Sequence, residues 1–236
     1  MTIMLSDKYP KLIRDLFLFD KSEQGQPKGI TDYNDILCSD TAHMPLRLPF
    51  DFSTEHLLAE AKHLNYHHKD GKYSWIYGRP GDIKDKYSTK LNTASQGAFI
   101  THKIKQYYTY KEEYNKLIKM SFFKTLIDSF NELVTVTDVI VKKLGPNDYI
   151  MPHTDSDINP WKIYIPLNWP NGNYFKIFRK GMVDMIPGQP YWINVGEHPH
   201  SVVNDSNEDR YIVSLYADWH TEEWKQVVET SWQNLK

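Results

Sequence analysis

Short β-strands separated by turns are the dominant pattern of residues 134–218. Residues 134–144 (VTVTDVIVKKL) alternate β-branched with polar side chains, and Gly-Pro-Asn-Asp at 145–148 predicts a turn after them. Further strands are predicted at 161–168, 174–178, 191–193 and 211–218. Asn171 and Gly172 are typical of a tight turn, so we expect the 161–168 and 174–178 strands to pair as a hairpin. This pattern favours a small β-barrel.

Helical patterns lie on both sides of this β-rich region. Ser53 is a favourable N-cap, and apolar residues recur at helical spacing after it. Residues 107–133 carry a second helical pattern, and a short C-terminal helix is predicted to begin near Thr221. We expect these helices to pack on the outside of the barrel.

The chain of 236 residues is interpreted as one domain. A helical annex occupies residues 1–133, a β core residues 134–220, and the C-terminal helix residues 221–236. Within the annex, the segment 71–97 is rich in Gly, Lys, Asp, Ser and Asn. Such a segment can be a lid over an active site or a surface connection, and the sequence supports both interpretations equally.

Composition argues against several classes of protein. The formal net charge of −2 lacks the basic excess of a nucleic-acid-binding protein. Cys38 is the single cysteine, which excludes an internal disulfide and suits a reducing compartment. No apolar run has the length of a membrane span, which is about 18 residues or more. We therefore expect a cytoplasmic protein with no nucleic-acid, membrane or obligate protein partner.

His153, Asp155 and His200 form a candidate metal site. In extended backbone, residues two apart point to the same side, so His153 and Asp155 can share one ion at the barrel rim. Two imidazoles and one carboxylate leave coordination positions open, and this set is typical of non-haem Fe(II) oxygenases.

Two other histidines are alternative candidates for a metal ligand. His68 and Asp70 have the same spacing as His153 and Asp155, but their polar surroundings without a strand pattern predict a solvated turn. His198 lies two residues before His200 and precedes a proline in a predicted turn, which favours a place at the rim of the site over a place on the metal.

Arg210 opens the predicted strand at 211–218. A cation that points into a small barrel is costly unless an anion meets it, and a guanidinium matches a carboxylate with two parallel hydrogen bonds. Arg210 therefore predicts a clamp for an acidic co-substrate. The alternative is an ordinary salt bridge to Asp209 or Glu208.

Together these residues resemble the aspartyl/asparaginyl β-hydroxylase family of Fe(II)/2-oxoglutarate-dependent oxygenases. The run 144–155 (LGPNDYIMPHTD) is similar to the family's stretch that leads into the first ligand histidine. Residues 162–167 (KIYIPL) are similar to its next strand, and 200–210 (HSVVNDSNEDR) to the segment from the second ligand histidine to the arginine. The resemblance covers residues 134–220 and does not extend to the N-terminal half.

The resemblance implies a mainly β fold with flanking helices, built on a double-stranded β-helix (jelly-roll, cupin-like) core. It implies Fe(II) held by His153, Asp155 and His200, with Arg210 binding the distal carboxylate of 2-oxoglutarate and O2 as the second co-substrate. The activity implied is hydroxylation of an amino acid, peptide or other small molecule, with release of succinate and CO2.

Lys162 and Tyr164 occupy positions where the family has arginine and histidine, which help to hold the co-substrate. They are candidates for the same role, although lysine lacks the fork of arginine, and the alternative for Lys162 is an exposed strand residue. The neighbouring aromatic residues can wall the site against water or form ordinary barrel core: Trp161, Tyr164, Trp169, Tyr174 and Trp192.

Two other functions fit the same residues. One is a cupin-like metalloenzyme that does not use 2-oxoglutarate, in which Arg210 is structural. The other is a catalytically inactive jelly-roll binding module, in which the polar cluster is a hydrogen-bonded rim.

Overall fold

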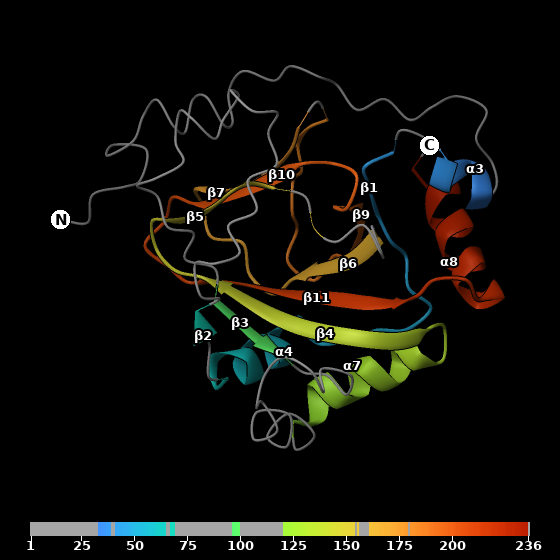
Figure 1. Cartoon of the computed structure of the whole chain (residues 1–236). Helices are drawn as coiled ribbons and strands as arrows, with labels where there is room; N and C mark the ends of the chain where they lie inside the picture. The colour runs from blue at the N-terminus through green and yellow to red at the C-terminus, as the bar shows by residue number, and fades with distance from the viewer. Residues whose placement is uncertain are drawn as a thin grey trace.

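Two antiparallel sheets form the body of the protein (Figure 1). The computed structural model describes residues 33–38, 41–64, 67–68, 96–99, 120–153, 155, 161–178 and 180–235. The larger sheet contains, in spatial order, β1 (His43–Pro45), β9 (Tyr191–Asn194), β6 (Trp161–Pro166), β11 (Arg210–Asp218), β4 (Thr135–Leu144), β3 (Gln96–Phe99) and β2 (His67–His68). The smaller sheet contains β5 (Asp148–His153), β10 (His200–Asn204), β7 (Asn173–Ile177) and β8 (Gly181–Met182).

The chain crosses between the two sheets as it runs from β4 to β11. Strands β4, β6, β9 and β11 lie in the larger sheet, whereas β5, β7, β8 and β10 lie in the smaller one. An apolar cluster joins the sheets, because it contains Tyr164 and Ile212 of the larger sheet and Phe175 and Val202 of the smaller. This strand order is that of a jelly roll, or double-stranded β-helix. The predicted mainly β fold with a jelly-roll core is confirmed.

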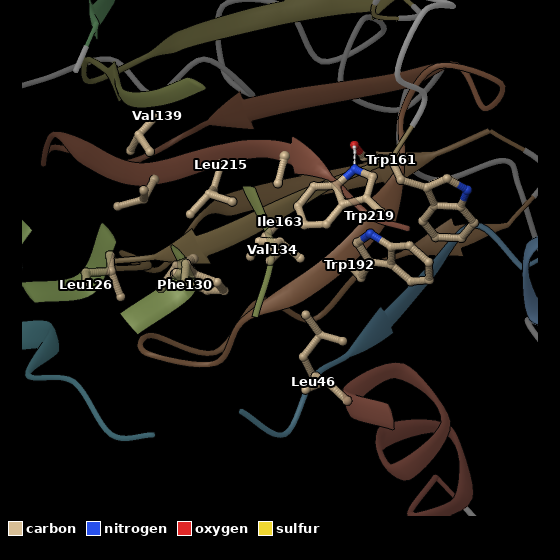
Figure 2. Close-up of a cluster of buried hydrophobic side chains, with 14 of the residues drawn as sticks. Leu46, Leu126, Phe130, Val134, Val139, Trp161, Ile163, Trp192, Leu215 and Trp219 are labelled. Carbon is tan, nitrogen blue, oxygen red and sulfur yellow. Dashed lines mark hydrogen bonds between the residues drawn. The ribbon is translucent and has the colours of Figure 1, made fainter. Parts of the chain in front are cut away.

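Alternation along the strands of the larger sheet separates two apolar cores. On β11, Val213 and Leu215 belong to a core on the outer face, whereas Ile212 belongs to the cluster between the sheets. Figure 2 shows the outer core, in which the Trp161 and Trp192 rings stack with centroids 4.1 Å apart. Because successive side chains point to opposite faces, one strand supplies the outer core and the barrel interior at once.

Helices cover the outer face of the larger sheet. They are α4 (Thr54–Lys62), α7 (Ser121–Asn131) and α8 (Glu222–Gln233), and a short helix, α3 (Tyr33–Cys38), lies near α8 (Figure 1). Their buried side chains share the outer core, among them Leu57 of α4, Phe130 of α7 and Trp224 of α8. The expectation that helices pack outside the barrel is therefore confirmed.

The helix ends are capped as elementary rules require. The Ser53 hydroxyl accepts a hydrogen bond from the His56 amide at the start of α4, and Thr221 caps α8 in the same way. The residue before α7 has no capping side chain, but the Glu60 carboxylate accepts from the amides of Phe122 (3.1 Å) and Phe123 (2.9 Å). An acidic side chain of α4 thus accepts hydrogen bonds from backbone N–H groups in the first turn of α7, which have no partner within that helix.

One predicted strand pairing is wrong. β7 does not pair with β6 but lies in the smaller sheet between β10 and β8. The turn at Asn171 and Gly172 exists, with a left-handed φ of 90° at Gly172, but it carries the chain from one sheet to the other. Turn residues such as Asn-Gly predict that the chain changes direction. Which strand then pairs with the next one depends on how the apolar faces pack.

Two further expectations fall in the N-terminal half. His68 lies in β2, paired with Gln96 of β3, so the predicted solvated turn is wrong for His68, and Asp70 lies outside the described residues. Residues 71–95 of the predicted lid or connection and residues 107–119 of the predicted helix also lie outside them. The division into annex, core and C-terminal helix stays a prediction.

In the described part of the chain, no helix combines the length and apolar character needed to cross a membrane. The cytoplasmic location stays a prediction.

Gly172 is the position where we expect the backbone to tolerate a side chain least. A Cβ there would lie 2.2 Å from the Asp205 carbonyl oxygen, on a residue whose φ already disfavours L-amino acids. We predict that Gly172→Ala lowers the free energy of unfolding by about 2 kcal/mol or more. Gly145→Ala is the matched control, because its nearest neighbour is the Asp148 carboxylate, which can move. Urea denaturation measures both, and equal losses would contradict this account.

Candidate metal and co-substrate site

The two candidate ligand histidines are paired across neighbouring strands. His153 is the last residue of β5, His200 is the first of β10, and the register places them directly opposite each other. The buried His200 ring stacks on Phe175 with centroids 5.6 Å apart, and its Nδ1 lies 3.4 Å from the His198 carbonyl oxygen. When Nδ1–H donates to this carbonyl, Nε2 keeps the lone pair that a metal ion needs. The His153 side chain lies outside the described part of the structure.

Asp155 lies just beyond the end of β5. Its backbone N–H donates to the Val195 carbonyl oxygen at 2.8 Å, which ties this segment to the connection between β9 and β10. Its carboxylate forms an ion pair with the Lys162 ammonium through Oδ2. The described side chains, which do not include that of His153, contain no cluster of three His, Cys, Asp or Glu able to hold a metal ion. The backbone positions of His153, Asp155 and His200 nevertheless converge at one end of β5 and β10.

Lys162 is a buried cation at the centre of the larger sheet. Its side chain is 2% exposed, and its ammonium lies 4.5 Å from the centroid of the Tyr216 ring. Burial lowers the pKa of Lys162, and the negative charge of Asp155 opposes that shift. The alternative of an exposed strand residue is therefore wrong, because β6 is flanked by strands on both sides and every residue in it is buried.

Tyr164 follows Lys162 on the interior face of β6. Its hydroxyl accepts a hydrogen bond from Nζ of Lys142 on β4 (3.3 Å), and that ammonium lies 5.1 Å from the centre of its ring. Burial raises the pKa of Tyr164, with the charge of Asp155 as a smaller cause, so the phenol stays protonated at neutral pH. A neutral hydroxyl beside an ammonium can both accept from the lysine and donate to an anion.

Arg210 is a second buried cation, opposite Leu144 at the start of β11. Its side chain is 2% exposed, its guanidinium carbon lies 5.3 Å from the Trp169 ring, and burial lowers its pKa to about 10, so it is charged at neutral pH. Among the described residues, neither Nε nor Nη1 has a hydrogen-bond partner. Within the described ranges, Arg210 forms no salt bridge with Glu208 or with Asp209, which pairs with Lys143 at 3.0 Å. A buried guanidinium with two unpartnered nitrogens is a binding group for an anion.

These polar residues follow the interior face of the barrel. Tyr164 lies opposite Ser214 on β11, and Arg210 lies four residues before Ser214 on the same face. Alternate residues on a strand are about 7 Å apart. A polar row therefore leads from Asp155 and Lys162, past Tyr164, to Arg210.

The neighbouring aromatic residues divide between the two faces of the sheet. Tyr164 and Trp169 pack on the cluster between the sheets, whereas Trp161 and Trp192 belong to the outer core. Tyr174 is 36% exposed. Of the five aromatic candidates, Tyr164 and Trp169 therefore line the interior. Trp161 and Tyr164 face opposite ways because they are an odd number of residues apart on one strand.

Lys142 and His43 are two ionisable residues on the interior face that sequence analysis does not identify. Lys142 lies in a strand that the sequence alternation predicts. It is two residues before Leu144, which belongs to the interior cluster, so both side chains point to the interior face. His43 lies opposite Ile193, which in turn lies opposite Lys162, so all three share one face. No local signal identifies His43, because β1 is three residues long and, among the described strands, pairs with β9 alone.

Comparison with known proteins gives matches in structure only. Neither a protein-family model nor a curated protein sequence matches the chain. A prolyl-4-hydroxylase from Pseudomonas putida is similar at 16% identity and a TM-score of 0.46, over 78% of this chain and 95% of that one. A 2OG-Fe(II) oxygenase family oxidoreductase from Burkholderia pseudomallei is similar at 14% identity and a TM-score of 0.45, over 83% and 94%. A cupin 2 conserved barrel domain protein from Salinispora arenicola is similar at 11% identity and a TM-score of 0.32, over 66% and 98%.

We predict that His43 makes stability depend on acid pH. Burial lowers its pKa from 6.5 to about 4, so between these values the unfolded chain binds a proton that the folded protein does not. Stability is therefore lost as pH falls from 6.5 toward 4, by about 2 kcal/mol at pH 4.5 relative to pH 7. His43→Gln removes this contribution, whereas the same change at the exposed His220 keeps it. Urea denaturation at both pH values measures the difference, and a wild-type slope in His43→Gln would refute the assignment.

Proposed function

We propose that this chain is an Fe(II)- and 2-oxoglutarate-dependent dioxygenase that hydroxylates an amino acid, a peptide or another small molecule. The observation that carries the proposal is Arg210, a buried guanidinium with two unpartnered nitrogens on the same interior face as Lys162 and Tyr164. A metal ion held near Asp155 and His200 would give this row a second binding point. A ligand with one carboxylate for Arg210 and a metal-chelating group at its other end would then fit both ends of the row. 2-Oxoglutarate, a keto acid with a distal carboxylate, has that form.

We propose His153, Asp155 and His200 as the iron ligands. The donor set fits the metal, since it offers two imidazoles and a carboxylate, and the His200 tautomer that donates from Nδ1 to the His198 carbonyl is the one that presents Nε2 to a metal ion. A carboxylate has two oxygens and about four lone-pair sites, so the ion pair of Asp155 with Lys162 is compatible with a metal bond from the same group.

We propose that Arg210 binds the distal carboxylate of 2-oxoglutarate, with Tyr164 beside it as a hydrogen-bond donor. Lys142 adds positive charge through its contact with the Tyr164 hydroxyl. Lys162 supplies positive charge at the Asp155 end, where the keto-acid group belongs. Arg210 at one end, and Fe(II) together with Lys162 and Asp155 at the other, would both carry net positive charge and favour a dianionic co-substrate over a monoanion.

Iron, 2-oxoglutarate and O2 bound together supply the oxidising chemistry, in which 2-oxoglutarate becomes succinate and CO2 and one oxygen atom enters a substrate C–H bond as hydroxyl. The contribution of this chain is binding, orientation and exclusion of water. Lys162 and Arg210 hold the two ends of an extended anion, and the apolar cluster that contains Phe175 and Ile212 keeps bulk water from the space between the sheets.

Among Fe(II)- and 2-oxoglutarate-dependent oxygenases, we propose a place for this chain near the aspartyl/asparaginyl β-hydroxylases. The support is the residue pattern of the runs 144–155 and 200–210, which contain the proposed ligands and Arg210 at the family's spacing. Lysine and tyrosine at 162 and 164, where the family has arginine and histidine, are the departures from that pattern.

Arg210→Met tests the co-substrate clamp. We expect it to weaken 2-oxoglutarate binding by about 100-fold or more, because a buried carboxylate loses its charged partner. The measurement is an anaerobic titration of the Fe(II)-loaded protein with 2-oxoglutarate, followed by its visible charge-transfer band. Arg47→Met, at an exposed position, is the control and keeps wild-type affinity. Absence of the band and of succinate formation in the wild type would overturn the function, and undiminished turnover in Arg210→Met would favour a cupin-like enzyme without 2-oxoglutarate.

A second test separates the metal ligand His200 from its neighbour His198. We expect His200→Ala to weaken Mn(II) binding by more than the roughly 10- to 100-fold that follows loss of a partner behind a ligand. His198→Ala keeps the backbone carbonyl that faces His200, so it retains the metal. Equilibrium dialysis with Mn(II) measures both. The opposite ranking would move the ligand to His198, and no binding by the wild type would support an inactive module.

A further inference from the structure

Arg210 is the first residue of β11, at the junction between this strand and the turn that precedes it. β6 ends at Pro166, opposite Ile212, so the regular ladder between β6 and β11 does not reach Arg210. On the other side of β11, Arg210 is paired with Leu144, the last residue of β4. The guanidinium lies about 6 Å from Cα. A backbone tilt of roughly 10° would therefore move it by about 1 Å, a misplacement that can cost about 100-fold in function.

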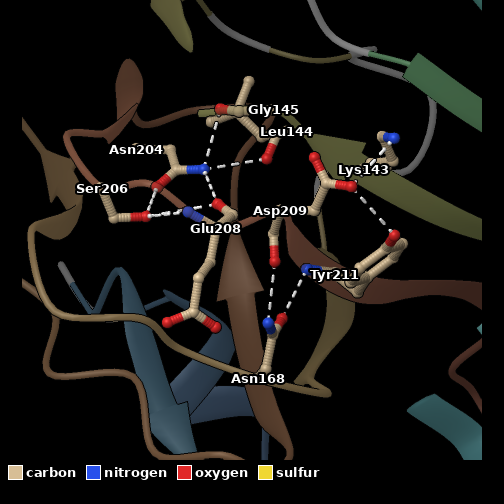
Figure 3. A network of polar contacts seen from close by, with 9 residues as sticks. All are labelled: Lys143, Leu144, Gly145, Asn168, Asn204, Ser206, Glu208, Asp209 and Tyr211. Carbon is tan, nitrogen blue, oxygen red and sulfur yellow. Dashed lines mark hydrogen bonds and ion pairs between the residues drawn. The ribbon is translucent and has the colours of Figure 1, made fainter. Parts of the chain in front are cut away.

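Asn168 replaces the missing part of the ladder with its side chain. Its Nδ2 donates to the Asp209 carbonyl oxygen at 2.8 Å, and its Oδ1 accepts from the Tyr211 amide at 2.7 Å (Figure 3). These are the peptide groups on either side of Arg210. The Leu167 amide also donates to the Tyr211 carbonyl oxygen at 3.0 Å. A carboxamide has one donor and one acceptor end, so it can imitate the edge of a strand.

A second asparagine, Asn204, links the end of β4 to the turn that precedes Arg210. Asn204, which is fully buried, directs its Nδ2 at the carbonyl oxygens of Leu144 (2.9 Å), Gly145 (2.8 Å) and Glu208 (2.7 Å). Its Oδ1 accepts from Asn173 of β7 at 2.9 Å. Figure 3 shows this network around the turn that precedes Arg210. The end of β4 and the turn between β10 and β11 are thus fixed to each other, while Asn168 is attached to the residues that flank Arg210.

We infer that Asn168 is a positioning residue of the co-substrate site, which holds the backbone on both sides of Arg210 so that the guanidinium meets a carboxylate. This inference rests on the proposed function. Asn168 acts through Arg210 and is remote from Asp155 and Lys162 along the interior row. Its removal is therefore expected to change anion binding without changing metal binding.

The test is a double-mutant cycle between Asn168 and Arg210. We expect Asn168→Ala to weaken 2-oxoglutarate binding to the Mn(II)-loaded protein by about 10-fold or more, and to leave Mn(II) affinity within about threefold of the wild type. In the Arg210→Met background, Asn168→Ala is expected to change 2-oxoglutarate affinity by less than about twofold, because the group that it positions is gone. Asn171→Ala, in the exposed turn of the same connection, is the matched control.

Asn168→Asp is the second variant, used if Asn168→Ala does not fold. It keeps the acceptor for the Tyr211 amide but sets a carboxylate oxygen against the Asp209 carbonyl, and we expect a loss of 2-oxoglutarate affinity of the same kind. Two results would show that Asn168 only stabilises the fold. One is an equal loss of 2-oxoglutarate affinity in the wild-type and Arg210→Met backgrounds, and the other is an equal loss of Mn(II) and 2-oxoglutarate affinity. Wild-type affinity in either Asn168 variant would also overturn the inference while the clamp stands. Wild-type affinity in Arg210→Met would overturn the clamp itself, and the inference with it.

Discussion

The burial of two cations between apolar sheets is the constraint on which the rest of the site depends. Lys162 and Arg210 are each only 2% exposed, and an ammonium or guanidinium in such surroundings costs several kcal/mol unless a partner compensates. Lys162 has its partner in Asp155, whereas Arg210 has the face of Trp169 and two unpartnered nitrogens. At the Lys162 end of the interior, Asp155 balances the positive charge. At the Arg210 end, the positive charge needs an anion.

The jelly roll makes this division possible, because β4, β6, β9 and β11 of the larger sheet each contribute side chains to two cores. Side chains that point outward join the core beneath the helices, and side chains that point inward include the apolar cluster that joins the two sheets. The interior face is then free to carry polar residues at a tolerable cost. Helix capping belongs to the same arrangement, since Glu60 of α4 satisfies the first turn of α7 and so fixes the layer that covers the sheet.

Turns and strand ends place the chemically important groups. His153 and His200 are the last and first residues of adjacent strands, and Arg210 opens another. Side chains at strand ends can face a cavity while the ladder behind them fixes the backbone. Where the ladder stops short, as beside Arg210, the carboxamide of Asn168 continues it. The turn at Gly172 is held by a close approach to Asp205 that only glycine accommodates.

The sequence by itself determined most of the local structure. Alternation in residues 134–144 and 211–218, the turn at 145–148 and the caps at Ser53 and Thr221 each depend on neighbours in the chain, and each was predictable for that reason. The residue types at 153, 155, 200 and 210 also predict a metal and an anion from sequence alone.

Tertiary structure decided which strands became neighbours and what each interior side chain meets. β7 pairs with β10 instead of β6, Lys162 is buried against Asp155, Asp209 pairs with Lys143, and Asn168 flanks Arg210 from a different strand connection. None of these contacts has a local signal, because each joins segments that are brought together only when two apolar sheet faces exclude water from the space between them. Sequence spacing specifies the face on which a residue lies, and the packing of faces specifies its partner.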